Sequence, residues 1–170
     1  ISQSGETLDT MAALREAKSL GARIVSIVNV VGSSIARESD DVLYTWAGPE
    51  IAVATTKAYS TQMAVLDLLA IYLAGQRKTI TAEDMCRLTS AIAALPAQVE
   101  QILSNREQIQ YYASQYFNHD SVFFIGRNLD YALGMEGSLK LKEISYIHSE
   151  AYASGELKHG TISLIEPGTL

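Results

Sequence analysis

A chain of 170 residues, of which 48% are apolar and 19% charged, has the composition of a soluble globular protein with a sizeable core. Its net charge of −6 comes without any block of Lys and Arg, which argues against nucleic acid as a partner. The longest strongly apolar run, residues 63–74, is interrupted by Asp67 and is far shorter than the ~20 residues of a membrane span.

The cysteine and histidine content further restricts the kinds of site that this protein can contain. The single cysteine, Cys86, excludes a disulfide framework and favours a reducing compartment, so we expect a cytoplasmic protein. Three scattered histidines and one cysteine do not form a metal-ligand pattern. The chain begins at Ile1 without a Met, and we expect both of its ends to be cuts through a longer protein.

The first half of the chain alternates helical and strand patterns. Apolar residues recur at helical spacing over 7–20, and Gly21 ends that predicted helix. Residues 24–28 form a nearly continuous β-branched run, typical of a strand buried on both faces. The next predicted elements are a turn at 31–34 that feeds a short helix, a strand at 41–44 and a long helix over 54–73. This alternation indicates βαβ units and a parallel sheet.

The middle of the chain reads as helix throughout, and a second strand-turn-helix unit follows it. Helical spacing begins near Met85, and Pro96 is predicted to interrupt the helix before the pattern resumes. The second unit comprises a buried strand at 122–125, a turn at 126–128 and a helix over 131–147. The likeness of the two units hints at an internal duplication.

Residues 2–7, which we call the hydroxyl loop, lie directly before the first predicted helix. Ser2, Ser4 and Thr7 supply hydroxyls, Gln3 an amide, and Gly5 lets the backbone come close. Free N–H groups and the dipole of a helix start favour anions, and ligands of open α/β sheets bind beyond the carboxyl ends of strands. The same residues also fit an ordinary N-cap with polar neighbours, so the residues alone leave both readings open.

Three charged residues have spacings that place them on one face of the last predicted helix. Glu136, Lys140 and Glu143 are four and three residues apart. Two carboxylates beside an ammonium could poise one carboxylate as a general base. A solvated ion-pair stripe of little energetic consequence has the same spacing.

A histidine in a glycine-bounded stretch is a third candidate. His159 lies within Gly-Glu-Leu-Lys-His-Gly, residues 155–160. Histidine titrates near neutral pH, so it is a candidate acid/base group, although a lone loop histidine can equally have a surface role. No P-loop and no dinucleotide G-x-G-x-x-G motif is present.

Together these stretches resemble the sugar isomerase (SIS) domain family. The hydroxyl loop looks like the family's phosphate loop, and residues 33–40 and 50–58 resemble the next segments of the same domain. Leu-Lys-Leu-Lys-Glu-Ile-Ser-Tyr-Ile-His at 139–148 and Glu-Ala-Tyr-Ala-Ser-Gly-Glu-Leu-Lys-His-Gly at 150–160 are more specific. Both resemble the second SIS domain of the glucosamine-6-phosphate synthase family.

The resemblance implies an α/β fold with doubly wound, flavodoxin-like parallel sheets flanked by helices. Two SIS units would be joined by a helical connector. Residues 1–75 would form the C-terminal part of the first SIS domain, 76–118 the connector and 119–170 the N-terminal part of the second.

The resemblance also implies an activity, the conversion of fructose 6-phosphate and glutamine-derived ammonia to glucosamine 6-phosphate, with no metal or organic cofactor. The residues that would hold the sugar phosphate are Ser2, Gln3, Ser4 and Thr7, and Val53 and Thr55 would line the sugar site.

By the same resemblance, Glu143 would move the proton between C1 and C2 of the sugar. Lys140 would contact the sugar hydroxyls and steady the enediol-like charge, and Glu136 would support that helix face. His159 would assist ring opening from the neighbouring subunit, which implies a homodimer.

The sequence departs from the family at two loop positions, with Thr161 and Val31 where the family often has proline. Both changes affect loop stiffness rather than chemical groups. The family's glutaminase domain and its C-terminal tail, whose lysine forms a Schiff base with the sugar, are not in this sequence, so we expect this stretch alone to be inactive. The alternatives are a non-catalytic SIS module that senses a hexosamine phosphate and a related SIS isomerase or deglycase.

Overall fold

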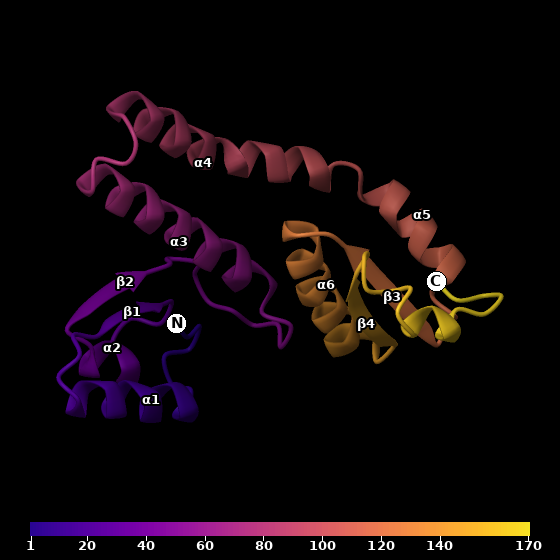
Figure 1. The fold of residues 1–170 in the computed structure, drawn as a ribbon, viewed down its shortest axis with the longest axis horizontal. Coiled ribbons are helices and arrows are strands. Elements are labelled where there is room, and N and C mark those ends of the chain that lie inside the picture. Colours follow the sequence, from indigo (N-terminus) through magenta and orange to yellow (C-terminus); the bar gives the residue numbers. More distant parts are fainter. The chain divides into compact units, whose positions relative to one another are not determined.

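The computed structural model describes all 170 residues, which divide into two compact units, Ile1–Pro96 and Ala97–Leu170. Each unit holds a pair of parallel strands with helices packed against it (Figure 1). None of the helices is both long enough and apolar enough to cross a lipid bilayer.

The first unit is built around β1 and β2, which pair in parallel from Val25↔Asp41 to Val28↔Tyr44. Ser2 forms a parallel bridge with Val28, so the start of the chain extends the sheet on the other side of β1. Figure 1 shows α1 and α2 on one face of these strands and α3 on the other. The elements of this unit are α1 (Leu8–Ser19), β1 (Val25–Val28), α2 (Ser34–Glu38), β2 (Asp41–Tyr44), α3 (Thr56–Gln76) and most of α4 (Ala82–Leu103).

The core of the first unit forms where α1 and α2 meet β1. Its buried members come from all three elements: Met11, Leu14, Val28, Ile35 and Ala36. Val28 is fully buried, as the continuous β-branched run predicts for a central strand. Burying these side chains fixes the height of α1 over the sheet and therefore the place of the hydroxyl loop that enters it.

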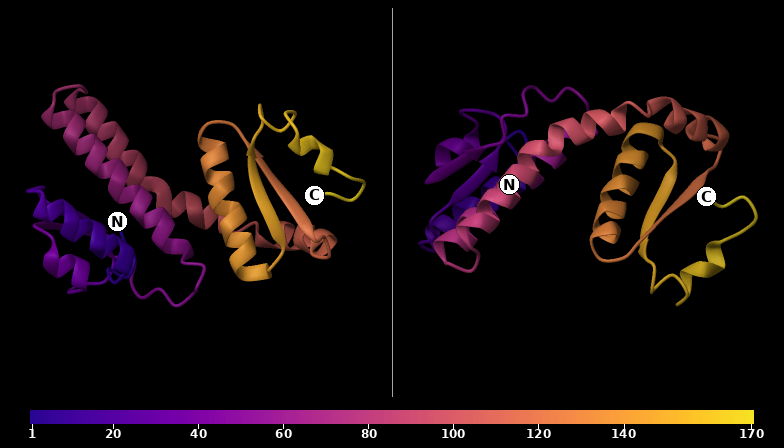
Figure 2. Two further views of the ribbon diagram at one scale, coloured as in Figure 1. Left: turned by 60° about the horizontal axis from the view of Figure 1, so that its bottom comes forward. Right: turned by 90° about the horizontal axis from the view of Figure 1, so that it is seen from above.

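The second unit repeats the parallel strand pair. β3 and β4 pair from Ser121↔His148 to Gly126↔Ala153, and α6 packs on one face of them (Figure 2). The buried Ser149 of β4 donates to the carbonyl of Ser138 on α6 (2.8 Å). The elements are α5 (Arg106–Tyr116), β3 (Ser121–Gly126), α6 (Leu129–Ser145), β4 (His148–Ala153) and the 3₁₀ helix η1 (Thr161–Leu164).

The parallel α/β architecture and the elements α1, β1, α2, β2, α3, β3 and α6 confirm the sequence predictions. The predicted interruption at Pro96 is wrong, because α4 continues through it. Proline removes one hydrogen bond at a cost of about 3 kcal/mol. Good helix formers on both sides offset this cost, and no residue of α4 is buried, so water can reach the freed carbonyl.

A second difference concerns the end of α6. The helix ends at Ser145 rather than at residue 147, since Tyr146 adopts a left-handed conformation (φ 62°) and caps the helix by donating to the carbonyl of Lys142. The strand β4 follows and was not predicted. Apart from Tyr152, its small and charged residues have low β-propensity, and their burial does not alternate with the period of two typical of a half-buried strand.

The division into 1–75, 76–118 and 119–170 stays a prediction. The boundary between the two compact units falls at Pro96 within α4, inside the predicted connector.

Candidate active site

The hydroxyl loop lies at the carboxyl edge of the first sheet. The backbone N–H of Ser2 donates to the carbonyl of Ile27 (3.0 Å), and the N–H of Asn29 donates to the carbonyl of Gln3 (3.2 Å). The chain then turns out of the sheet and enters α1. This is the position at which open parallel sheets bind their ligands.

Hydrogen bonds inside the hydroxyl loop fold it into a compact turn. The hydroxyls of Ser2 and Thr7 are 2.8 Å apart, and the N–H of Gly5 donates to Ser2 Oγ (3.1 Å). Ser4 Oγ accepts from the N–H of Glu6 (3.2 Å), and both Ser4 and Thr7 are exposed. Thr7 makes no side-chain capping bond to α1, so the first N–H groups of that helix stay open to a ligand.

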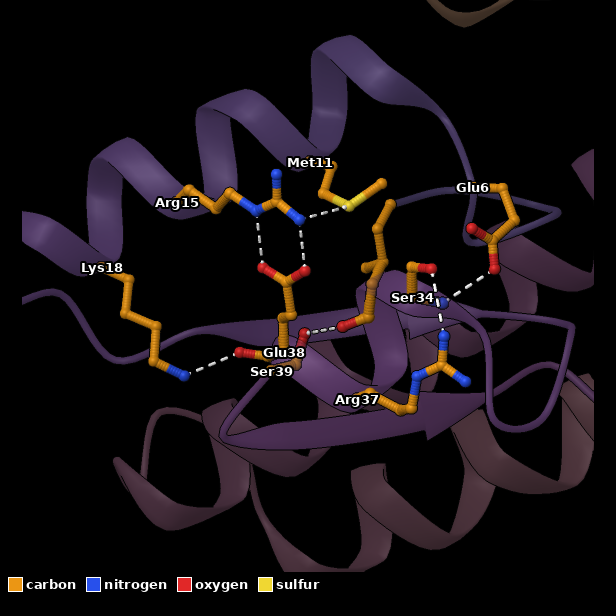
Figure 3. Close-up of polar contacts among 9 residues, drawn as sticks. Glu6, Met11, Arg15, Lys18, Ser34, Arg37, Glu38 and Ser39 are labelled. Atoms are coloured by element: carbon orange, nitrogen blue, oxygen red, sulfur yellow. Dashed lines mark hydrogen bonds and ion pairs between the residues drawn. The ribbon is translucent and has the colours of Figure 1, made fainter.

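The start of α2 braces the hydroxyl loop from the other side. The N–H of Ser34 donates to the Glu6 carboxylate (2.8 Å; Figure 3). The N–H of Ile35 donates to the carbonyl of Gly5 (2.9 Å). The bond from the Ser34 N–H lowers the pKa of Glu6, so the carboxylate stays charged at neutral pH. The positive N-terminal end of α2 is therefore occupied by the Glu6 carboxylate, whereas the N-terminal end of α1 is open to a ligand.

Gly5 permits this close approach. A Cβ atom at Gly5 would lie 2.0 Å from Ser33 Oγ, and its φ of +68° is one that side chains disfavour. Ser33 is 3% exposed and its hydroxyl has no hydrogen-bond partner; Gln3 Oε1 is also buried without a partner. The loop is thus packed tightly around polar atoms that it does not itself satisfy.

The predicted sugar-lining residues lie in the segment that joins β2 to α3. Val53 is 86% exposed, and its carbonyl accepts from the hydroxyl of Thr55 (2.8 Å). Thr55 occupies the N-cap position of α3 with a left-handed backbone (φ 54°, ψ 40°). That conformation is strained for a β-branched residue, and such strain is typical of functional segments.

In the second unit, the predicted charged face of α6 is confirmed as a geometric cluster. Lys140 Nζ lies 2.7 Å from Glu143 Oε2 and 3.5 Å from Glu136 Oε1. The three side chains are only 21–29% exposed. The hydrogen bond with Glu143 raises the pKa of Lys140, so the cluster holds a permanent ammonium between two carboxylates.

His159 lies in the turn after β4, and its side chain is exposed. Its N–H donates to the carbonyl of Glu156 (2.9 Å) within that turn. Ser154 fixes the start of the turn, because both its N–H (2.8 Å) and its hydroxyl (3.0 Å) donate to the carbonyl of Gly126.

The structure thus brings together Ser2, Gln3, Ser4 and Thr7 in one loop of the first unit, and Glu136, Lys140 and Glu143 on one helix of the second. Sequence reasoning missed Asn29, whose side chain binds the loop that follows β2. The available signal was its position, since a polar residue directly after a buried strand of a parallel sheet lies at the ligand-binding edge.

Comparison with known proteins agrees with this architecture. The SIS domain family model matches residues 1–72 and 115–170. Curated relatives named glutamine–fructose-6-phosphate aminotransferase [isomerizing] are 56% identical in Clostridium acetobutylicum and 60% identical in Caldanaerobacter subterraneus subsp. tengcongensis. Both alignments cover 100% of this chain and 28% of the relative, so the chain spans little more than a quarter of their length.

Two solved structures show the same fold. The C-terminal domain of glucosamine-fructose-6-phosphate aminotransferase from Francisella tularensis matches 98% of this chain and 48% of its own, with a TM-score of 0.94 and 40% identity. A glucosamine-6-phosphate deaminase from Thermotoga maritima matches 99% of this chain and 49% of its own, with a TM-score of 0.69 and 25% identity. Since the family model covers well over half of the residues, this chain belongs to the SIS domain family.

Proposed function

We propose that this chain is part of the sugar-phosphate isomerase region of a glutamine–fructose-6-phosphate aminotransferase. The reaction converts fructose 6-phosphate and glutamine-derived ammonia to glucosamine 6-phosphate. The observation that carries the proposal is the match of the whole chain, at 56% and 60% identity, to relatives of that name. The deaminase is a much more distant match, at 25% identity.

The hydroxyl loop is proposed to bind the phosphate of the sugar. The exposed hydroxyls of Ser4 and Thr7 and the open N–H groups of α1 are donors suited to phosphate oxygens. Ser2 and Gln3 would contribute partly through their backbone, and Val53 and Thr55 would line the sugar. The deeply placed Ser2 hydroxyl also holds Thr7 in position.

The α6 cluster is proposed to carry the isomerisation. Moving a proton between adjacent carbons requires a base and a group that stabilises the negative enediol-like oxygen. Glu143 would be the base, and the Lys140 ammonium, which lies 2.7 Å from it, would stabilise the oxygen and contact the sugar hydroxyls. Glu136 would keep Lys140 in place from the other side. These groups supply what the proton transfer needs, so we propose no metal or organic cofactor.

His159 is proposed to assist ring opening as an acid/base group, reaching the active site of the neighbouring subunit in a homodimer. Its support is the exposed side chain at the tip of a turn that Ser154 anchors to β3. We also propose a cytoplasmic location, because the chain has a single cysteine and because its proposed substrate is a sugar phosphate of the kind found inside cells.

The test is product formation by the full-length protein that contains this chain. With fructose 6-phosphate and glutamine it should yield glucosamine 6-phosphate and glutamate, and omitting glutamine should stop the reaction unless ammonia is supplied. Release of ammonia from glucosamine 6-phosphate as the main activity would favour a deaminase instead. Binding of hexosamine phosphates without any turnover would favour a sensor module.

A further inference from the structure

Asn29 directly follows β1 and links two segments of the first unit. Its backbone N–H donates to the carbonyl of Gln3 (3.2 Å), which extends the parallel bridge between Ser2 and Val28. The hydroxyl loop is therefore tied to Asn29 through the backbone, and this tie does not depend on the Asn29 side chain.

The side chain of Asn29 serves a different segment, the loop at 45–48 that follows β2. Asn29 Oδ1 accepts from the hydroxyl of Thr45 (3.0 Å) and from the N–H of Ala47 (2.8 Å), while Nδ2 donates to the carbonyl of Gly48 (2.7 Å). The Ala47 N–H can only donate and the Gly48 carbonyl can only accept. These partners fix the orientation of the amide and require a side chain with both an acceptor and a donor.

The loop at 45–48 needs such a restraint, because its backbone is strained. Trp46 (φ 53°) and Gly48 (φ 70°) both have left-handed conformations, and Trp46 is a large residue for which that conformation is unfavourable. Trp46 is 76% exposed, and its ring lies 5.6 Å from that of Tyr44 between ring centroids. The bond from Ala47 to Asn29 holds the peptide between these two left-handed residues.

The loop at 45–48 leads directly into the segment that carries Val53 and Thr55. We propose that Asn29 is a positioning residue, which sets the place of Val53 and Thr55 relative to the hydroxyl loop and thereby determines affinity for the sugar rather than for its phosphate. The proposal rests on the function proposed above. It adds that affinity for the sugar and affinity for the phosphate depend on different segments of the site. Aspartate would keep the acceptor but lose the donor to Gly48, and alanine would lose both.

The experiment measures the KM and kcat for fructose 6-phosphate, and the inhibition constant of inorganic phosphate, in the full-length enzyme. Asn29→Ala should raise the KM about tenfold, the change expected when misplacement of Val53 and Thr55 costs about one net hydrogen bond to the sugar. The kcat and the phosphate inhibition constant should stay within about twofold of wild type, because the backbone tie to Gln3 remains. Asn29→Asp should recover part of the KM. The matched control is Asn105→Ala, since Asn105 makes no side-chain capping bond.

Thr45→Val keeps the shape of its residue and removes only one donor to Asn29, so it provides a second, milder variant if Asn29→Ala does not fold. It should also raise the KM and leave the phosphate inhibition constant alone. The proposal is overturned if the KM is unchanged, or if both constants rise together in Asn29→Ala and Thr45→Val, as general loosening of the unit would cause. A wild-type enzyme that binds inorganic phosphate but does not turn over fructose 6-phosphate would instead remove the proposed function, and this inference with it.

Discussion

At the scale of single residues, the α6 cluster is asymmetric. Lys140 lies 2.7 Å from Glu143 but 3.5 Å from Glu136, and the hydrogen bond with Glu143 is the largest cause of its raised pKa. A solvated stripe of ion pairs would expose all three side chains, whereas these are less than a third exposed. The two carboxylates therefore differ in their contact with Lys140, and the roles proposed for them are a base for Glu143 and a support for Glu136.

Glu143→Gln in the full-length enzyme is therefore expected to lower turnover of fructose 6-phosphate by ~10²–10⁴, the usual loss when a general base is removed. Substrate affinity should change little, because the amide keeps the shape of the carboxylate. Glu136→Gln should have a smaller effect. Product formation and substrate affinity are measured for each variant, with Glu107→Gln on α5 as the matched carboxylate-to-amide control. Near-normal turnover in Glu143→Gln would refute the assignment.

A second residue-scale prediction concerns Gly5. Gly5→Ala adds both an unfavourable φ of +68° and a Cβ atom 2.0 Å from Ser33 Oγ, whereas Gly21→Ala adds only an unfavourable φ of +83° in open space. We expect Gly21→Ala to lower the free energy of unfolding by about 1 kcal/mol and Gly5→Ala by about 2–5 kcal/mol. Urea unfolding measures both. Equal losses for the two variants would show that the contact with Ser33 does not constrain the hydroxyl loop.

At the scale of elements, α1 and α2 are joined by an ion pair and a side-chain hydrogen bond as well as by the core. Arg15 donates from Nε (2.8 Å) and Nη2 (2.6 Å) to the two oxygens of Glu38, and Lys18 donates to the Glu38 carbonyl (2.7 Å) (Figure 3). Because Glu6 also bonds to Ser34 at the start of α2, that short helix is held at both ends against segments that carry the candidate phosphate site.

The pairing with Arg15 gives this contact a pH dependence. The hydrogen bonds from the Arg15 guanidinium lower the pKa of Glu38 below its ordinary value of 4.5. A carboxyl whose pKa is lower in the folded state stabilises the protein above its unfolded pKa, and the stabilisation is lost as the pH falls through the folded pKa. Glu38→Gln should thus lower Tm at pH 7, and the gap to wild type should close as the pH falls below about 4.

Thermal unfolding of the wild type, Glu38→Gln and the control Glu16→Gln at several pH values checks this. Glu16 is an exposed residue of α1, the helix that carries Arg15, and its backbone carbonyl accepts from the Ser19 hydroxyl and the Leu20 N–H. Its variant should show no gap that depends on pH. A Glu38→Gln gap of constant size down to pH ~3 would mean that the charge of Glu38 does not contribute.

At the scale of the whole molecule, the proposed homodimer makes a prediction about mixed subunits. His159→Ala and Glu143→Gln should each inactivate a pure dimer. If His159 serves the neighbouring site, a mixed dimer of the two variants has one site with an intact Glu143 from one subunit and an intact His159 from the other. Co-expression should therefore restore activity at one of the two sites of each mixed dimer.

The two variant subunits carry different tags in this experiment, so that mixed dimers can be purified and assayed apart from the pure dimers of each variant. A mixed dimer as inactive as either parent would mean that His159 acts on its own subunit. An active monomeric enzyme would rule out the dimer requirement altogether.

The sequence by itself determined what depends on neighbours along the chain. The helical spacing in 7–20 and the β-branched run at 24–28 predicted α1 and β1, because side-chain periodicity directly reflects local backbone geometry. For the same reason, intervals of four and three residues sufficed to place Glu136, Lys140 and Glu143 on one face of α6.

Only the tertiary structure decided what depends on contacts between distant segments. The contact of Gly5 with Ser33 and the bonds from Asn29 to the loop at 45–48 join residues 16–28 positions apart, and no local pattern encodes them. β4 is a strand despite its weak β-propensity, because it pairs along its full length with β3 and Ser149 packs on Ser138 of α6. Backbone pairing and burial supplied by other elements outweighed the local preference of those residues.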